Sequence, residues 1–199
     1  MTEDRSYVIE DRIKKLEQLR ELGVEPFGYS FAVTHTSTAA KELLPPDAAE
    51  GPSVVRVAGR LVSMRSHGKT SFAHLSDRAG RVQLYLRKDV IGDDAYAVLN
   101  LLDTGDWIGV SGTMMRTKTG EVTIKVETFE VLAKAIRPLP LGKEEINEET
   151  GERIVHSGFA DLEQRYRQRY ADLAVHPEVR ALFRARSRKI SAIRHMLDA

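Results

Sequence analysis

Residues 54–86 read VVRVAGRLVSMRSHGKTSFAHLSDRAGRVQLYL, in which apolar and polar side chains alternate between turn signals. A period of two with many β-branched residues is typical of strands that have one buried face. Gly59 is expected to kink the first strand, and residues 77–80 to form a turn between the second and third. The segment therefore predicts three strands, at Val54–Arg65, Ser71–Ser76 and Val82–Leu86.

Downstream of this segment, the spacing of Tyr96, Leu99 and Leu102 predicts one helix over residues 93–102. Two further strands are expected after it, at Trp107–Arg116 and Val122–Leu132. Three strands, one helix and two strands form the order of an OB-fold, a small five-stranded Greek-key barrel. Another small antiparallel barrel or sandwich would share this order, so the order alone leaves those architectures open.

The flanking segments predict helices. Residues 2–22 carry an apolar stripe that Gly23 and Pro26 bring to an end, and residues 26–53 form an irregular lead-in with one helical turn near 38–44. Helices are also expected at 161–172 and, after Pro177, from residue 178 onward. The expected fold class is mainly β with flanking helices, with the five-stranded OB-fold barrel preceded by an N-terminal helix and followed by C-terminal helices.

Four segments make up the expected domain organisation. They are the helix and lead-in at 1–53, the barrel at 54–136, a linker with an acidic insertion at 137–160, and a helical segment at 161–199. The stretch 142–158 contains KEEINEETGE, and we interpret it as a solvated hairpin or loop. The last helix presents an apolar face and stops without a cap, which we interpret as a chain cut short.

Composition limits the classes of function. The 199 residues include 42% hydrophobic side chains and no cysteine, which excludes disulfide-stapled miniproteins, thiolate metal sites and cysteine nucleophiles. No apolar run approaches the roughly 20 residues that cross a bilayer, and the acidic N-terminus lacks a signal-peptide pattern. We expect a soluble, cytoplasmic protein without a membrane partner.

Basic residues gather in the first strands, although the whole chain carries 30 Lys and Arg against 29 Asp and Glu. Residues 54–78 hold five basic side chains and one acidic side chain. The outer face of strands one to three in an OB-fold binds single-stranded nucleic acid through aromatic stacking and cations. A local basic face of this kind predicts a nucleic-acid interface.

The second and third strands offer side chains suited to reading a base. Phe72 and His74 share one face, and Phe72 could stack on a base if that face is outward; periodicity alone leaves the reversed register equally open. Gln83 and Tyr85 share a face of the third strand, where the amide of Gln83 could form a two-point hydrogen bond with a base edge.

Signals for catalysis are weak throughout. The chain has no glycine-rich phosphate loop, and its six histidines show no ligand spacing, so neither a catalytic residue nor a metal site is expected. Residues 161–199 carry nine basic and five acidic side chains. This excess fits RNA contact and fits pairing with the carboxylates of an adjoining domain equally well.

The chain contains the stretches RIKKLEQLRELGVEPFGYSF, VAGRLVSMRSHGKTSFAHLSDRAGRVQLYLRKD, GDWIGVSGTMMRTKTGEVTIKV, LAKAIRPLP and EQRYRQRYADLAVHPEVRALFRARSRKISAIRHMLDA. Together these stretches, which span nearly the whole chain, resemble the lysine-specific class II aminoacyl-tRNA synthetases, the lysine-tRNA ligases. Within them, GRVQLYLRKD and RYRQRYADL distinguish the lysine enzymes from the aspartate and asparagine enzymes, which share the barrel.

The resemblance implies a tRNA anticodon-binding role for the barrel. It implies that Phe72 stacks on the central anticodon uridine, which favours the outward face, and that Arg65, Gln83 and Glu121 also contact the anticodon. Further RNA contacts implied at the same face are those of Arg60, His67, Lys69 and His74.

For the full-length enzyme, the resemblance implies use of ATP and Mg2+ to activate lysine and attach it to lysine tRNA, within a homodimer. Residues 161–199 resemble the start of the catalytic domain, but the sequence ends before the motifs that bind ATP and lysine. We therefore expect this fragment to be inactive alone and to bind no cofactor. The alternatives are a free-standing, non-catalytic OB-fold RNA-binding module and the anticodon domain of an aspartate- or asparagine-type synthetase.

Overall fold

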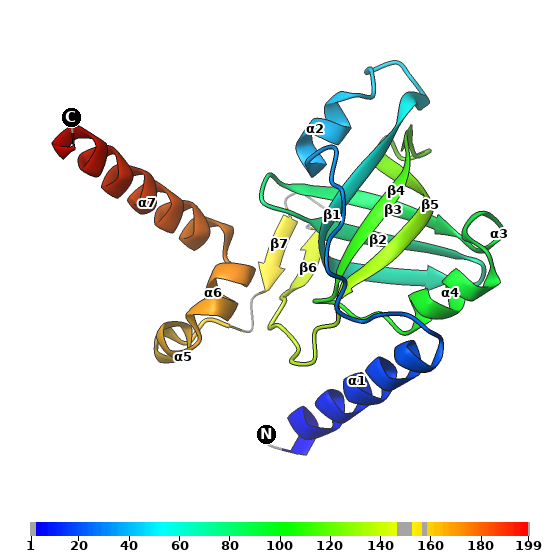
Figure 1. Cartoon of the computed structure of the whole chain (residues 1–199), viewed down its shortest axis with the longest axis horizontal. Helices are drawn as coiled ribbons and strands as arrows, with labels where there is room; N and C mark the ends of the chain where they lie inside the picture. The colour runs from blue at the N-terminus through cyan, green and yellow to red at the C-terminus, as the bar shows by residue number, and fades with distance from the viewer. Residues whose placement is uncertain (1–2, 147–152, 157–158, 199) are drawn as a thin grey trace. The chain divides into compact units, whose positions relative to one another are not determined.

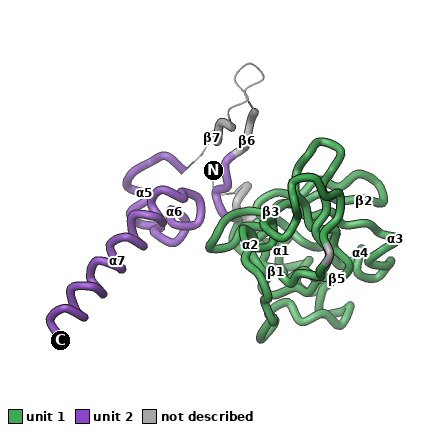
Figure 2. The backbone as a smooth tube through the Cα atoms, turned by 90° about the horizontal axis from the view of Figure 1, so that it is seen from above, with its two compact units in different colours: residues 1–138 green, residues 139–199 purple. Residues whose placement is uncertain are grey.

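The computed structural model describes residues 3–146, 153–156 and 159–198. The chain divides into two compact units, residues 1–138 and residues 139–199, coloured separately in Figure 2. The N-terminal helix and the lead-in thus fall in the same unit as the barrel. Within the described ranges, no helix combines the length and the apolar character needed to span a bilayer.

The first unit is built on a closed five-stranded barrel (Figure 1). Neighbouring strands follow the order β1, β2, β3, β5, β4, and all pairs are antiparallel except β3 with β5, which runs parallel and closes the barrel. The strands are β1 (Glu50–His67), β2 (Thr70–Ser76), β3 (Arg81–Arg87), β4 (Trp107–Arg116) and β5 (Val122–Ala133). The expected fold class is confirmed.

The structure differs from the sequence-based prediction at the start of β1 and before the helix of the barrel. Strand β1 begins at Glu50, before the expected Val54, because Glu50 also pairs with Met115 of β4. The helix expected at 93–102 is present as α4 (Asp93–Asn100), and a short helix that the sequence did not predict, α3 (Lys88–Ile91), precedes it. Gly92 between them has a φ of 89°, which no right-handed helix accommodates, so the chain turns there.

The barrel interior is filled by alternate residues of each strand. In β2 and β3 every second residue is buried, so that Ala73 and Leu75 lie inside, opposite Leu84 and Val82. The register between β4 and β5 shifts at Ser111 and Gly112, and a Cβ atom at Gly112 would lie 2.1 Å from the carbonyl oxygen of Lys125. A glycine is therefore required where β5 approaches β4 this closely.

Helix α1 (Glu3–Glu21) packs on the barrel through Leu16 and Leu19, which are buried. Its Arg12 donates hydrogen bonds to the carbonyl oxygens of Thr104 and Ala135, at 3.0 and 2.7 Å. The helix ends at Glu21, just before Gly23, which adopts a φ of 74° as expected of a residue that stops a helix. These contacts make the helix part of the barrel unit.

A buried cluster of charges lies below this helix. The Nζ atom of Lys134 lies 2.6 Å from Asp103 and 2.8 Å from Asp106, and the side chains of Lys134 and Asp106 are fully buried. Burial alone would raise the pKa of Asp103, but hydrogen bonds from Lys134 and Lys15 lower it below its ordinary value. The cluster therefore links the segment before β4 to the end of β5.

The second unit contains a β-hairpin and three helices. Strands β6 (Lys143–Ile146) and β7 (Arg153–His156) pair antiparallel, within the stretch interpreted as a hairpin or loop; residues 147–152 and 157–158 of that stretch lie outside the described residues. The helices are α5 (Leu162–Arg167), α6 (Arg169–Val175) and α7 (Pro177–Leu197). The single helix expected at 161–172 is wrong, because Gln168 leaves the helical region at φ −113°, ψ 56°.

Asp172 organises the helices of the second unit. Its fully buried carboxylate accepts hydrogen bonds from Arg165 at 2.8 Å, from Arg169 and from His176 at 2.8 Å. Burial alone would raise the pKa of Asp172, but the bonds from Arg165 and His176 lower it. The arginines of α5 and α6 thus have carboxylate partners within their own unit.

Candidate nucleic-acid interface

Residues that the sequence predicts to contact nucleic acid lie on the solvent side of β1, β2 and β3. The alternation in β2 buries Ala73 and Leu75 and leaves Phe72 and His74 partly exposed on the opposite side, which we call the outer face. The register left open by periodicity is therefore the outward one for Phe72. Gln83 and Tyr85 of β3 lie on the same face.

Aromatic and cationic side chains meet at one end of the outer face. Phe72 lies opposite Tyr85 in the β2–β3 ladder, with ring centroids 4.8 Å apart at an interplanar angle of 30°. On its other side, Phe72 lies opposite the exposed Arg65 of β1. A base stacked on Phe72 would therefore have a guanidinium beside it, which is the combination that single-strand binding uses.

A hydrogen-bonded network lies next to this aromatic pair. Gln83 donates from Nε2 to Oε2 of Glu121 at 2.9 Å, and its Oε1 accepts from the Thr123 hydroxyl at 2.7 Å. His74 lies directly opposite Gln83 in the ladder and places Nε2 3.3 Å from Oε1 of Glu121. Ser63 of β1 closes the network through its Oγ, 2.9 Å from Nδ1 of His74.

The other residues expected to contact RNA do not all lie beside Phe72 and Gln83. His67 and Lys69 flank the β1–β2 turn and are exposed, at the end of the outer face near Arg65. Arg60 lies five residues from Arg65 along β1. It donates a hydrogen bond to the carbonyl oxygen of Gly105 at 2.8 Å, and its guanidinium carbon lies 5.2 Å from the centroid of the Trp107 ring. The structure therefore brings Arg65, Phe72, Gln83 and Glu121 together, and Arg60 lies further along β1, opposite Ser76 of β2.

Sequence reasoning missed Ser63 and Thr123 as members of this network. Thr123 lies opposite Gln83 because β3 and β5 pair in parallel, 40 residues apart along the chain. Local periodicity carries no signal for such a pairing, which only closure of the barrel produces. Ser63 follows the register shift in β1 between Leu61 and Ser63, which a simple alternation does not predict.

The turn that joins β2 to β3 is fixed by Asp77. Its carboxylate accepts hydrogen bonds from the amide and hydroxyl of Ser37, at 2.6 and 2.7 Å, and from the amides of Ala79 and Gly80. Burial alone would raise the pKa of Asp77, but these bonds lower it below 3.8. Helix α2 (Ser37–Glu42) and the turn are thereby tied together.

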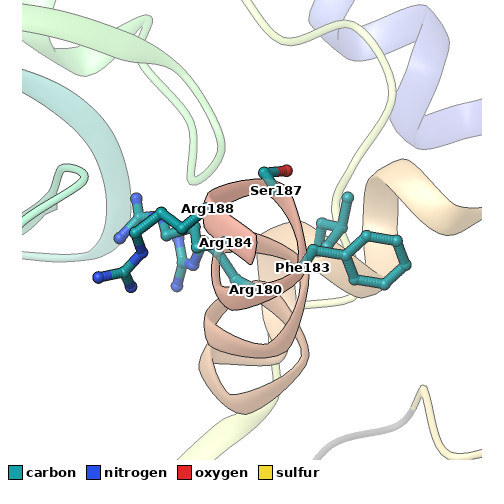
Figure 3. Close-up of a pocket in the computed structure, with 6 residues that line it drawn as sticks. Arg180, Phe183, Arg184, Ser187 and Arg188 are labelled. Atoms are coloured by element: carbon teal, nitrogen blue, oxygen red, sulfur yellow. The ribbon is translucent and has the colours of Figure 1, made fainter. Parts of the chain in front are cut away.

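Other parts of the described chain are weaker candidates for a functional site. Among residues 3–146, 153–156 and 159–198, no group of three or more His, Asp or Glu side chains could hold a metal ion. Figure 3 shows Arg180, Arg184 and Arg188 on one side of α7 and Phe183 on another side, around a shallow depression. This depression lacks the paired aromatic and amide side chains that the outer face provides.

Comparisons with known proteins agree with this geometry. The family described as "OB-fold nucleic acid binding domain" matches residues 55–132, which span most of the barrel. The chain is 44% identical over 191 residues to a lysine-tRNA ligase of Carboxydothermus hydrogenoformans, covering 96% of this chain and 36% of that protein. Lysine-tRNA ligases of Moorella thermoacetica and Bacillus subtilis are 46% and 42% identical, with 94% of this chain covered in each. The chain spans little more than a third of the length of these relatives.

Proposed function

From its homology to the lysine-tRNA ligases, we propose that this chain is the anticodon-binding part of such an enzyme and that its outer face reads the tRNA anticodon. The observation that carries the proposal is the contiguity of Phe72 and Gln83 on the outer face of an OB-fold barrel. An exposed ring beside an amide suits one unstacked base, bound by its face and read at its edge.

Each side chain of the face has a distinct task in this proposal. The central anticodon uridine stacks on Phe72, whose ring is supported from behind by Tyr85 at 4.8 Å. Arg65 lies beside that ring and supplies positive charge to the RNA backbone. Gln83 meets the base edge with the donor and acceptor capacity that its bonds to Glu121 and Thr123 leave available.

Glu121, His67, Lys69 and His74 are the further RNA contacts that we propose. Glu121 keeps acceptor capacity on each carboxylate oxygen beyond its bonds to Gln83 and His74. His67 and Lys69 are exposed at the β1–β2 turn, where a bound loop of RNA would pass. Arg60 is occupied by Gly105 and Trp107, so its role in this proposal is to support the barrel.

The activity of the full-length enzyme completes the proposal. Its relatives are named lysine-tRNA ligases, so the complete protein would use ATP and Mg2+ to activate lysine and attach it to lysine tRNA. ATP and Mg2+ would need donor groups outside the described residues, which contain no metal-binding cluster. A homodimeric assembly and a cytoplasmic location belong to the same proposal.

The experiment that tests the proposal measures the affinity of this chain for anticodon stem-loops at fixed, moderate salt. The lysine-tRNA loop is compared with a loop in which the central uridine is replaced by cytidine, and with the aspartate- and asparagine-tRNA loops. Tighter binding of the lysine loop than of every other loop is the expected result. Equal affinity for the uridine and cytidine loops would contradict anticodon reading, and preference for the aspartate or asparagine loop would assign the chain to a sister enzyme.

A further inference from the structure

The turn between β1 and β2, residues 67–70, is held by the helical segment that joins β3 to β4. The hydroxyl of Tyr96 in α4 lies 3.0 Å from the carbonyl oxygen of Gly68, which has a φ of 60°. The carbonyl oxygen of the next residue, Lys69, accepts a hydrogen bond at 2.9 Å from the amide of Lys88, where α3 begins. Two consecutive carbonyl oxygens of the turn are therefore bound by donors that lie outside the hairpin.

A chain of hydroxyl groups connects Tyr96 to this turn in one direction only. A carbonyl oxygen only accepts, so the Tyr96 hydroxyl donates its single proton to Gly68. The hydroxyl of Ser71 lies 3.0 Å from that of Tyr96 and must then donate to it. The hydroxyl of Ser66 lies 2.9 Å from that of Ser71 and must donate in turn. Because each hydroxyl has one proton, no other arrangement makes all three hydrogen bonds.

Tyr96 can act on the turn but cannot touch RNA. Tyr96 is only 6% exposed and Ser71 is fully buried, whereas residues 67–69 are exposed. The ring of Tyr96 belongs to the hydrophobic core of the barrel, so its hydroxyl is carried by a well-packed side chain. The hydroxyl therefore links the exposed turn to the core.

The turn carries two of the side chains that we propose as RNA contacts, His67 and Lys69. A lysine side chain is a point charge on a flexible stem, so its own geometry does little to place the charge. A backbone that is already fixed before RNA binds lowers the entropy lost when the contact forms. Holding the turn should therefore strengthen the contact between Lys69 and a phosphate.

We propose that Tyr96 is a positioning residue whose hydroxyl holds the β1–β2 turn in place, so that Lys69 and His67 meet the phosphates of the bound anticodon loop. This inference rests on the proposed function, because the ligand is the same RNA. It adds to that function a buried residue of α4 that strengthens binding without contacting the RNA and without reading a base.

The test measures affinity for the uridine loop in a double-mutant cycle. Tyr96→Phe removes the hydroxyl and keeps the ring. Tyr96→Phe and Lys69→Gln are each expected to weaken binding roughly twofold to fivefold, the value of one exposed charge contact. The double variant should bind about as tightly as Lys69→Gln alone, because Tyr96 acts through the contact that Lys69→Gln has already removed. Losses that multiply fully would show that the two residues act independently and would overturn the inference.

Two further readouts distinguish positioning of the turn from general support of the fold. In Tyr96→Phe the slope of log affinity against log salt concentration should fall by up to about 0.7, the value of one phosphate contact to a single strand. The ratio of dissociation constants for the cytidine and uridine loops should stay at its wild-type value, because the turn reads no base. An unchanged slope, or a ratio that falls to one, would contradict the role in the turn.

Ser37→Ala is the matched control. It removes another fully buried hydroxyl, which donates to Asp77 at 2.7 Å, at the opposite end of β2 from the β1–β2 turn. This variant should have a lower free energy of unfolding and an unchanged affinity for the uridine loop. Equal losses of affinity in Ser37→Ala and Tyr96→Phe would show that lower stability alone weakens binding, and would overturn the positioning role.

The outcomes separate this inference from the proposed function. A wild-type chain that shows no preference for the uridine loop overturns the proposed function, and the inference with it. Wild-type preference together with unchanged affinity in Tyr96→Phe overturns the positioning role alone. Circular dichroism first verifies that each variant is folded.

A measurement on the wild-type chain decides the matter if Tyr96→Phe does not fold. The backbone NMR order parameters of Gly68 and Lys69 are expected near the value of about 0.85 that marks rigid backbone. Values below about 0.6 would show a flexible turn that Tyr96 does not hold, and would overturn the inference.

Discussion

Phe72 and Tyr85 face each other across β2 and β3 with their ring centroids 4.8 Å apart, on the outside of a barrel whose inside is filled by their sequence neighbours. Because Tyr85 covers one side of the Phe72 ring, a base has the remaining exposed surface of that ring to stack on. The pair is therefore a supported platform, and the RNA-binding predictions start from it.

Replacing Phe72 by Ala should weaken binding of the uridine loop by about 1 to 3 kcal/mol, because one base loses its stacking partner. Isothermal titration with a folded variant measures this loss. Tyr29→Ala is the control, since Tyr29 is a fully exposed aromatic residue of the lead-in. Unchanged affinity in Phe72→Ala, or equal losses in both variants, would contradict the stacking role.

Replacing Gln83 by Ala should reduce discrimination among loops more than it reduces overall affinity, because base edges specify whereas phosphate contacts position. The affinities for the uridine and cytidine loops are expected to converge in this variant. Filter binding with both loops at the same salt concentration gives the comparison. Parallel losses on all loops would show that Gln83 supports the face without reading the base.

Arg65→Gln should make binding less sensitive to salt. Each phosphate contact to a single strand contributes about 0.7 to the slope of log affinity against log salt concentration, so the slope should fall by about that amount. Arg56→Gln is the control, because Arg56 lies over Phe31 and near Glu130, on the part of β1 that pairs with β4. A slope that changes equally in both variants would argue against a contact specific to Arg65.

Lys134→Met should lower the free energy of unfolding by about 3 to 5 kcal/mol, because it leaves the fully buried Asp106 without its charged partner. Denaturant unfolding followed by circular dichroism measures the change. Lys88→Met serves as the control, since Lys88 pairs with Asp93, whose side chain is 83% exposed, and such pairs contribute less than about 1 kcal/mol. Similar losses in the two variants would contradict the importance of burial.

Asp77→Asn should change how stability depends on pH. Burial would raise the pKa of Asp77, but hydrogen bonds from Ser37 and the turn amides hold it below 3.8 in the folded chain. The ionised carboxylate therefore stabilises the fold above its unfolded pKa, and this contribution is lost as the pH falls through the lower, folded pKa. The difference in unfolding free energy between wild type and Asp77→Asn should shrink on acidification. A difference that is constant with pH would contradict the stabilising role of the ionised carboxylate.

Several features of the fold could be predicted from the sequence because they depend on short-range patterns. The alternation in β2 and β3, the bounds Trp107–Arg116 of β4 and the end of α1 near Gly23 all follow from residues next to one another. Local pattern failed at Gln168, whose backbone leaves the helical region within a sequence of good helix formers. Helices α5 and α6 meet at this residue, and Arg165 of α5 and Arg169 of α6 both pair with the buried Asp172.

In the candidate site, too, some features follow from local sequence and others only from the tertiary structure. The sequence by itself determined which side chains share a strand face, because alternation is a property of neighbouring residues: Phe72 with His74, and Gln83 with Tyr85. Only the tertiary structure decided that this face points outward and that Thr123 lies opposite Gln83 on the next strand. The reason is that closing the barrel sets the register between strands far apart in the chain, and burying one face of each strand turns the other toward solvent.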